Sequence, residues 1–208
     1  RVSSDQKFKE GDGLRQTFES TNKAEIIFLT NQGQAYKAHL YDFDDTKASV
    51  LGDYLPQKLG MDENEAPIFM LLPEDFSGNL VYVFENGKIA KVELSSFATK
   101  SNRRKLTGAY HMGSPLVAAF HTTPDAEIAL YSQSRILIVN TAQLQAKTTR
   151  AAQGVAVMTL KKNQSVIRAS LLHEAGIENI ARYRTRTLPA AGALIKEEDA
   201  PDKQMSLL

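Results

Sequence analysis

The sequence predicts an all-β, propeller-like domain that is built from a repeated unit. A two-stranded hairpin pattern occurs three times, and the turns of these hairpins, at Gly33, Gly87 and Ser134, are separated by 54 and 47 residues. A polar stretch, a glycine and an apolar segment follow each hairpin. A repeat of about 50 residues with about four strands is typical of propeller blades. The alternative is a two-sheet sandwich with similar hairpins, but the aligned hairpins and glycines favour blades.

The three hairpins are expected at residues 25–38, 79–94 and 126–141. In each of them, β-branched and aromatic residues flank a short turn that can adopt a positive φ, as a tight hairpin requires. The Asn86-Gly87 turn of the second hairpin is the strongest short signal for this structure. We therefore expect three copies of one hairpin.

Corresponding positions of the repeat become visible when the turns are aligned. The alignment brings together Ala35, Ile89 and Ile136 in the second strand of each hairpin. Apolar strands are then expected at 68–72 and 116–120, and the third copy continues into the segment QGVAVMTL. The glycines taken as equivalent after the hairpins are Gly60, Gly108 and Gly154.

A fourth, degenerate unit is expected to begin near Lys161, where KKNQ resembles the KEGD segment at 9–12. Residues 181–188 alternate like the second strand of a hairpin, whereas residues 171–180 could alternatively form a short helix. The predicted blade-like units are 7–60, 61–113, 114–160 and 161–195, arranged in a ring that is open or degenerate. A polar and flexible tail is expected at 196–208.

Composition and charge limit the class of protein. The chain of 208 residues has no cysteine, which excludes disulfides, thiolate metal sites and cysteine catalysis and is compatible with a cytoplasmic protein. The net charge of +1 hides an uneven distribution. Residues 1–95 carry 10 basic and 16 acidic side chains, residues 96–195 carry 13 and 4, and residues 196–208 carry 2 and 4. Such asymmetry is compatible with nucleic-acid binding and equally with solvated faces.

Four segments of the sequence resemble one family when they are read in order. They are KFKEGDGL (7–14), IIFLTNQGQAYKAHLYDF (26–43), LVYVFENGKIAKVELSSF (80–97) and KTTRAAQGVAVMTLKKNQSV (147–166). Together they resemble the C-terminal domain of the A subunits of bacterial type IIA topoisomerases, that is, of topoisomerase IV and of DNA gyrase. The first residue, Arg1, is also compatible with a piece of a longer polypeptide.

The resemblance implies a β-pinwheel, in which neighbouring propeller-like blades exchange strands. It also implies a domain that binds and bends double-stranded DNA on a basic rim and presents it to a cleavage core. No catalytic residue and no cofactor are implied for this domain, because the ATP and Mg²⁺ of the family's holoenzyme are used elsewhere. The topoisomerase B subunit would be a partner through the rest of the A subunit, in the bacterial nucleoid.

One departure from the family pattern favours topoisomerase IV. The gyrase polypeptide carries a box of the form Q-R-R-G-G-K-G, which permits full wrapping of DNA. The corresponding stretch here, residues 45–60 (DTKASVLGDYLPQKLG), lacks this box. The resemblance therefore favours relaxation and decatenation over supercoiling, with a gyrase domain carrying a diverged box as the alternative.

Basic residues recur between each hairpin and the glycine aligned after it. Lysine and arginine side chains that neutralise DNA phosphates release counterions, so a repeated basic position would form a binding rim. The densest cluster is Arg103-Arg104-Lys105, and alternating arginines in 181–188 would share one face of a strand, toward phosphates or toward water. The predicted DNA-binding residues are Lys47, Lys58, Lys100, Arg103, Arg104, Lys105, Lys147, Arg150, Lys161, Lys162, Arg182, Arg184 and Arg186.

Other kinds of site have little support in the sequence. No motif for base readout by a recognition helix is present, and the four histidines lack the spacing of metal ligands. We expect no metal site and no catalytic set, and we expect the acidic first unit to contribute less to the rim than the later units. The alternative function is a propeller-like module for protein interaction.

Overall fold

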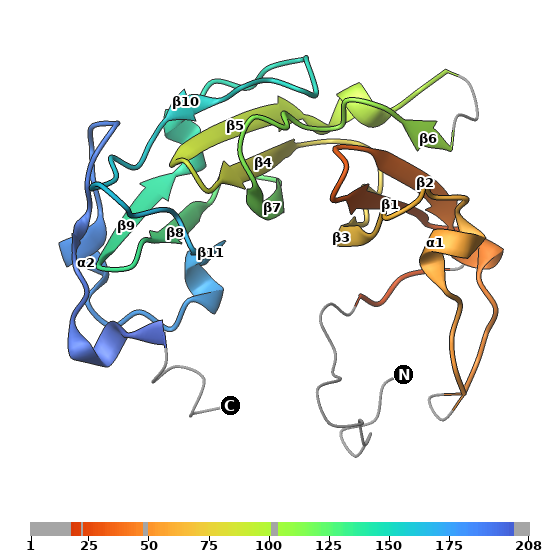
Figure 1. Cartoon of the computed structure of the whole chain (residues 1–208), viewed down its shortest axis with the longest axis horizontal. Coiled ribbons are helices and arrows are strands. Elements are labelled where there is room, and N and C mark those ends of the chain that lie inside the picture. Colours follow the sequence, from red (N-terminus) through yellow and green to blue (C-terminus); the bar gives the residue numbers. More distant parts are fainter. Residues whose placement is uncertain (1–17, 22, 48–49, 101–103, 202–208) are drawn as a thin grey trace. The chain divides into compact units, whose positions relative to one another are not determined.

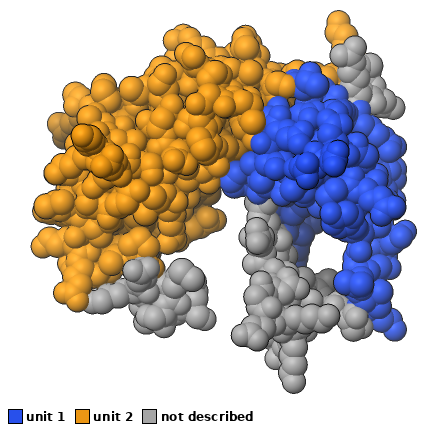
Figure 2. All heavy atoms as spheres, in the orientation of Figure 1, with its two compact units in different colours: residues 1–74, 102–107 blue, residues 75–101, 108–208 orange. Residues whose placement is uncertain are grey.

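A computed structural model of the protein describes residues 18–21, 23–47, 50–100 and 104–201. These residues form three four-stranded antiparallel sheets, which confirms the predicted all-β fold. The chain divides into two compact units (Figure 2). Unit 1 comprises residues 1–74 and 102–107, and unit 2 comprises residues 75–101 and 108–208.

The first sheet lies in unit 1 and has the strand order β3-β1-β2-β6 (Figure 1). Its centre is the first predicted hairpin, paired from Glu25↔His39 to Leu29↔Ala35. Its outer edge strand, β6, is two residues long and comes from beyond the second hairpin. The strands are β1 (Glu25–Thr30), β2 (Ala35–His39), β3 (Pro67–Leu71) and β6 (Lys105–Leu106).

The second sheet, in unit 2, repeats this plan with the order β10-β5-β4-β7. The second predicted hairpin forms its centre, and the edge strand next to β5 comes from beyond the third hairpin. Its strands are β4 (Asn79–Phe84), β5 (Lys88–Glu93), β7 (Leu116–Thr122) and β10 (Val155–Ala156).

The third sheet, also in unit 2, has the order β11-β8-β9-β12 around the third predicted hairpin. Both of its edge strands come from the fourth predicted unit, which therefore makes no sheet of its own among the described residues. The strands are β8 (Glu127–Tyr131), β9 (Arg135–Asn140), β11 (Arg168–Leu171) and β12 (Ala193–Leu194). Each sheet thus receives its outer edge strand from beyond the next repeat, which is the strand exchange of a β-pinwheel.

The expected alignment of glycines after the hairpins is wrong in detail. The register pairs Ala35 with Leu106, Ile89 with Val155 and Ile136 with Ala193, so the glycine that corresponds to Gly154 is Gly192. Both glycines have a positive φ, and an added Cβ would lie 2.6 Å from the carbonyl oxygen of Ile89 or 2.3 Å from that of Ile136. Glycine lets β10 and β12 approach the hairpin closely. Lys105 holds this position in the first sheet.

The strand expected over residues 181–188 is not formed. A short helix, α2 (Ile180–Tyr183), begins there, and Arg184 makes only an isolated bridge with Ile138. The alternative prediction is a helix over residues 171–180, of which the structure forms only a 3₁₀ turn at Leu172–Glu174. Arg182, Arg184 and Arg186 therefore do not share one face of a strand.

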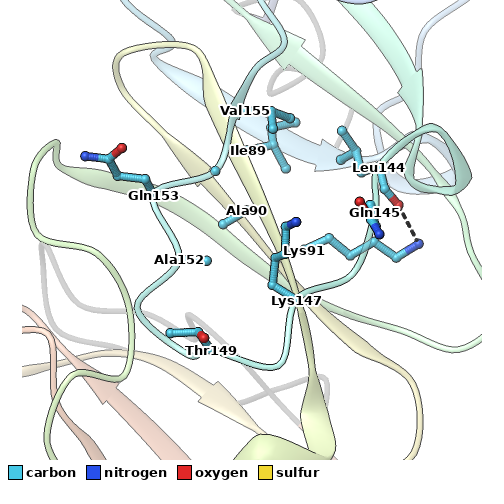
Figure 3. A pocket seen from close by; sticks show the side chains of 11 residues that line it. Ile89, Ala90, Lys91, Leu144, Gln145, Lys147, Thr149, Ala152, Gln153 and Val155 are labelled. Atoms are coloured by element: carbon cyan, nitrogen blue, oxygen red, sulfur yellow. Dashed lines mark hydrogen bonds between the residues drawn. The ribbon is translucent and has the colours of Figure 1, made fainter.

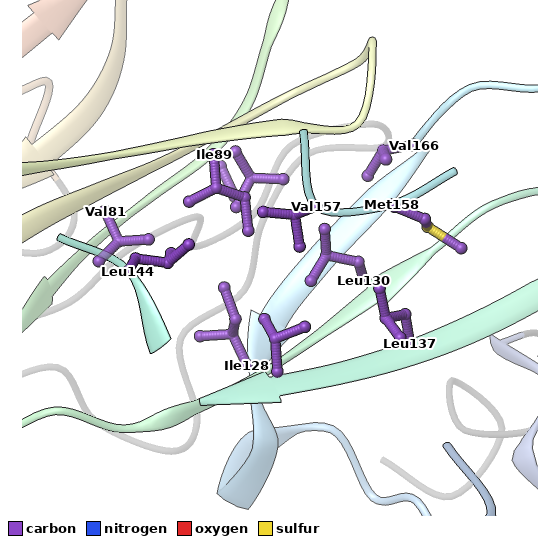
Figure 4. Close-up of a cluster of buried hydrophobic side chains, with 12 residues drawn as sticks. Val81, Ile89, Ile128, Leu130, Leu137, Leu144, Val157, Met158 and Val166 are labelled. Atoms are coloured by element: carbon purple, nitrogen blue, oxygen red, sulfur yellow. The ribbon is translucent and has the colours of Figure 1, made fainter. Parts of the chain in front are cut away.

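The fourth repeat instead covers the outer side of the third sheet. Strand β9 is a continuous apolar run because both of its faces are buried, as expected for a sheet covered on both sides. Ile136 and Ile138 pack with Tyr183 and Ile177 of the fourth repeat. The opposite face of this sheet meets the second sheet in the main core of unit 2, where Val81, Ile89, Ile128, Leu130, Leu137, Leu144, Val157, Met158 and Val166 gather (Figure 4).

The first part of the predicted flexible tail is docked. Asp199 is fully buried and accepts hydrogen bonds from the Tyr183 hydroxyl at 2.8 Å and from the backbone N–H of Glu178 at 2.7 Å. The described residues 196–201 therefore belong to the folded unit 2. Residues 202–208 lie outside the described part of the chain.

Helical structure is short throughout the described residues. None of these helices is long and apolar enough to cross a membrane. Beside α2, the structure has α1 (Leu55–Lys58) and five 3₁₀ helices at Leu40–Asp42, Leu94–Phe97, Thr141–Gln143, Leu172–Glu174 and Glu197–Asp199.

Candidate nucleic-acid interface

Several of the predicted DNA-binding residues lie on the segments that carry out the strand exchange. We call these segments crossovers: the first has the described residues 98–100 and 104 before β6, the second is 144–154 before β10, and the third is 172–192 before β12. Each crossover leaves a hairpin or its remnant and reaches the outer strand of the preceding sheet. Residues 43–60, with α1, follow the first hairpin but add no strand to any of the three described sheets.

A basic residue lies where each crossover meets the outer hairpin strand. Arg104 accepts a backbone hydrogen bond from Lys37 at 2.7 Å, and Lys147 donates one to Lys91 at 2.8 Å. In the third sheet Arg184 bridges Ile138. Lys147 bridges Val92 and Arg184 bridges Ile138, which lie three and two residues beyond the equivalent Ile89 and Ile136, so these two basic residues occupy neighbouring places. Arg104 instead continues the edge strand before Lys105 and corresponds to Gln153. Arg104, Lys147 and Arg184 are all exposed.

The second crossover presents its cation without an ionic partner. Lys147 makes no ion pair with any carboxylate in the described part of the chain, while its carbonyl accepts a hydrogen bond from Glu93 N–H at 2.9 Å. A cavity of about 370 Å³ lies between this crossover and β5 (Figure 3). Its lining includes Ile89, Leu144 and Val155, with Lys147 and Gln153 among its polar residues.

The third crossover presents a cation that is already paired. Arg184 donates from Nε to Glu127 Oε1 at 2.7 Å and from an Nη to Oε2 at 2.8 Å, which is a bidentate ion pair. These hydrogen bonds raise the pKa of the Arg184 guanidinium. A polar cavity of about 340 Å³ beside it is lined by Arg186, Gln143 and Asn140 among others.

The edge strand of the first sheet carries a third arrangement. Lys105 Nζ lies 2.8 Å from Asp62 Oδ2 and 5.8 Å from the centre of the Tyr36 ring. The hydrogen bonds from Lys105 and then from Gln34 hold the pKa of the Asp62 carboxyl below its ordinary value, and Asp62 raises the pKa of Lys105. Lys105, from the densest basic cluster of the sequence, therefore lies in unit 1. There it forms an ion pair with Asp62, which neutralises its charge.

A buried lysine that the sequence analysis missed holds the second crossover in place. Lys91 is 7% exposed, and its Nζ lies 2.7 Å from Asp125 Oδ1, 3.0 Å from the Thr141 carbonyl and 3.2 Å from the Leu144 carbonyl. Lys91, followed by Thr141, is the main cause that lowers the pKa of Asp125. Lys37 has the corresponding place in β2, so a lysine in the middle of two apolar strands was the available signal.

The predicted DNA-binding residues fall into two groups. The first group uses its cations within the fold: Lys58 pairs with Asp53 at 3.5 Å, Arg150 donates to Ser96 O at 2.9 Å and lies over the Phe97 ring, and Arg182 donates to Leu194 O at 3.3 Å. Lys105 and Arg184 belong to this group as well. Arg103 lies outside the described residues. The second group is exposed and makes no ion pair within the described part of the chain: Lys47, Lys100, Arg104, Lys147, Lys161, Lys162 and Arg186.

The arrangement offers exposed cations at the surface. Among the residues that the structure describes, no group of three or more His, Asp or Glu side chains could hold a metal ion. A β-pinwheel with basic crossovers is the class of protein that the fold and these residues define.

Comparison with known proteins finds relatives with a similar sequence and fold. A family model described as the DNA gyrase C-terminal domain, a β-propeller, matches residues 24–49 and 132–172. The A polypeptide of DNA topoisomerase 4 from Staphylococcus aureus strain MRSA252 is 26% identical over 163 residues, which are 76% of this chain and 20% of that relative. The chain therefore spans about a fifth of the length of the curated relatives it matches.

Solved structures share the fold. The C-terminal domain of DNA topoisomerase IV superimposes with a TM-score of 0.70 at 23% identity, covering 83% of this chain and 55% of that one. The E. coli ParC C-terminal domain gives 0.62 at 13% identity, covering 81% and 70%, and the DNA gyrase A C-terminal domain gives 0.60 at 15%, covering 86% and 64%. The chain is thus similar in sequence and fold to the C-terminal domains of bacterial type IIA topoisomerase A subunits.

Proposed function

We propose that the protein binds double-stranded DNA through its crossovers and bends it. The observation that carries this proposal is that an exposed basic residue bridges the outer hairpin strand in both crossovers of unit 2, Lys147 at Val92 and Arg184 at Ile138. Because duplex DNA carries closely spaced phosphates, a cation repeated from blade to blade can neutralise successive phosphates and release their counterions. The exposed cations Lys100, Lys161, Lys162 and Arg186 would add to this contact.

The binding should depend on the DNA backbone and not on base sequence. Among the described residues the α-helices, α1 and α2, have four residues each, which is too short to act as a recognition helix in the major groove. Phosphate contacts position a protein on DNA without reading its sequence. Any preference should therefore come from the deformability of the duplex.

The domain would present the bent DNA to the cleavage core of a type IIA topoisomerase. Topoisomerase IV is favoured over gyrase, because residues 45–60 lack the gyrase box and topoisomerase 4 polypeptides are among the similar proteins. The holoenzyme would then relax and decatenate DNA. In this proposal the domain supplies no catalytic group and no cofactor of its own, and the B subunit joins the complex through the rest of the A subunit in the bacterial nucleoid.

A second candidate function is protein interaction through residues 41–47 and 50–54. Exposed apolar side chains gather along these residues: Tyr41 is 61% exposed, Leu51 95% and Tyr54 72%. The neighbouring carboxylates Asp44 and Asp45 would repel DNA and would suit a basic partner. This role is compatible with DNA binding on the crossovers.

Duplex binding by variants tests the main proposal. Replacing Lys147 and Arg186 together by alanine should weaken binding to random duplex and reduce the slope of log K against log salt by about 0.9 for each lost phosphate contact. Lys23→Ala is the matched control, because Lys23 is exposed in the turn before β1 and belongs to unit 1, whereas Lys147 and Arg186 belong to unit 2. Failure of the unaltered protein to bind any duplex at low ionic strength would refute DNA binding and leave the protein-interaction role.

A further inference from the structure

The second and third sheets place their carboxylates differently at the corner where the crossover arrives. The first strand of the hairpin begins with Asn79 in the second sheet and with Glu127 in the third sheet. Opposite them the register places Glu93 and Asn140, respectively. The two sheets therefore have the same pair of residue types with the positions exchanged.

This exchange decides whether the crossover cation is paired. Glu127 grips Arg184 with both carboxylate oxygens, and the two residues are 57 positions apart in sequence. In the second sheet the corresponding residue is the neutral Asn79, and Glu93 on the other strand makes no ion pair with Lys147. A carboxylate at the start of β8 is thus placed to hold a cation that the second sheet leaves open.

We propose that Glu127 attenuates DNA binding at the third crossover by occupying Arg184. This inference rests on the proposed function and adds a regulating residue to the same site. The carboxylate takes one edge of the guanidinium, so a phosphate can reach only the remaining Nη donors. A phosphate bound there would also lie close to the negative charge of Glu127, which opposes its binding.

Because the ion pair is exposed, a DNA phosphate can compete with Glu127 for Arg184. The Arg184 side chain is 52% exposed and that of Glu127 is 28% exposed, so solvent reaches both groups. Exposed ion pairs contribute little to stability, and a DNA phosphate can therefore compete for the arginine. Neutralising Glu127 should release Arg184 without unfolding the sheet.

The first sheet contains a comparable pair in Lys105 and Asp62, with side chains 37% and 52% exposed. Asp62→Asn should release Lys105 in the same way, because an asparagine can still accept the hydrogen bond that Gln34 donates. The two pairs lie on different sheets and can be tested independently.

The experiment compares Glu127→Gln with a variant of equal charge. The probe is a random-sequence DNA duplex, titrated with the whole chain over a range of salt concentrations. Glu127→Gln should raise the affinity at low salt by about threefold to tenfold and steepen the salt slope by about 0.9, because one phosphate contact is added. Glu85→Gln is the control, since Glu85 is exposed at the turn between β4 and β5 and makes no ion pair within the described residues.

A double-mutant cycle separates the release of Arg184 from a general charge effect. In the background of Arg184→Ala, Glu127→Gln should change the affinity no more than Glu85→Gln does, because no cation remains to be released. An equal effect of Glu127→Gln with and without Arg184 would overturn the inference. Circular dichroism and thermal unfolding of each variant check that the fold is retained.

The outcomes also separate this inference from the proposed function. If the unaltered protein binds duplex and Glu127→Gln behaves like Glu85→Gln, the attenuation is refuted while DNA binding stands. If neither the unaltered protein nor Glu127→Gln binds duplex, both are refuted.

Discussion

The second and third sheets of unit 2 share a topology and differ in the side chains that hold their crossovers in place. In the second sheet the buried Lys91 holds the crossover through the Thr141 and Leu144 carbonyls and through Asp125. In the third sheet the residue that corresponds to Lys91 is the apolar Ile138. There the exposed ion pair between Arg184 and Glu127 holds the crossover against the sheet. The second sheet thus uses an internal cation for structure and leaves Lys147 open to a partner.

The comparison shows that one backbone arrangement can be stabilised by different side chains. Strand exchange needs close backbone approach, and both sheets meet this need with a glycine before the edge strand. The polar contacts around the crossover can then vary. Where they are internal, as at Lys91, they stabilise the fold, and where they are exposed, as at Arg184, they affect what the surface can bind.

The largest expected effect comes from the glycine that both sheets share. Gly154→Ala should lower the free energy of unfolding by about 2–4 kcal/mol, because a Cβ would be strained at this positive φ and would clash with the Ile89 carbonyl. Gly192→Ala should act similarly in the third sheet. Denaturant unfolding measures both, and Gly52→Ala, where nothing lies within 4 Å of the added Cβ, should cost little. Equal stability of all three variants would contradict the close approach.

A smaller effect is expected at the buried lysine of the second sheet. Lys91→Met should cost about 2 kcal/mol, because Asp125 and two carbonyl oxygens lose their donor. Thermal or denaturant unfolding measures this change. Lys88→Met, at the start of the same strand, is a control that should be nearly neutral, and a similar loss in both variants would show that Lys91 has no special role.

The same ion pair predicts an acid dependence of stability. The pKa of Asp125 is lowered in the folded protein, so its contribution is present above the ordinary value of 3.8 and is lost as the pH falls through the folded pKa. Asp125→Asn should therefore flatten the loss of stability below about pH 4. Unfolding curves at several acidic pH values measure this, and an unchanged profile would show that Lys91 does not stabilise the carboxylate.

The smallest expected effect distinguishes the two crossover cations in binding. Lys147→Ala should weaken duplex binding by about fivefold, whereas Arg184→Ala should weaken it by about twofold or less, because Glu127 already occupies Arg184. Fluorescence anisotropy at one low salt concentration compares them. A greater loss for Arg184→Ala would mean that the ion pair opens completely when DNA binds.

The hairpins could be predicted because their signals are local. In the second hairpin, the Asn-Gly turn and the alternating apolar residues on both sides of it fit within about 16 residues. All three hairpins are found at the expected positions. The edge strands could not be predicted in this way. Strands β6, β10 and β12 have two residues each and are defined by pairing with a hairpin more than 50 residues earlier in the chain.

The candidate site was predictable only as a set of positions. The sequence places Lys147 and Arg184 among many basic residues, but the partner of Arg184 is 57 residues away and only the register brings them together. The fourth hairpin was also expected to be degenerate. The sequence did not show that this repeat covers the third sheet, because Tyr183 and Ile177 pack on a face that no local pattern identifies.

The most direct test of the central claim measures lysine reactivity with and without DNA. A limited amine-acetylation reaction, read by mass spectrometry, should show Lys147, Lys161 and Lys162 protected when random duplex is bound. Lys23, which is exposed in the turn before β1 in unit 1, should react equally in both states, and the buried Lys91 should react in neither. Protection of Lys147 with unchanged Lys23 would support DNA binding on the crossovers, whereas protection of Lys23 with an unprotected Lys147 would contradict it.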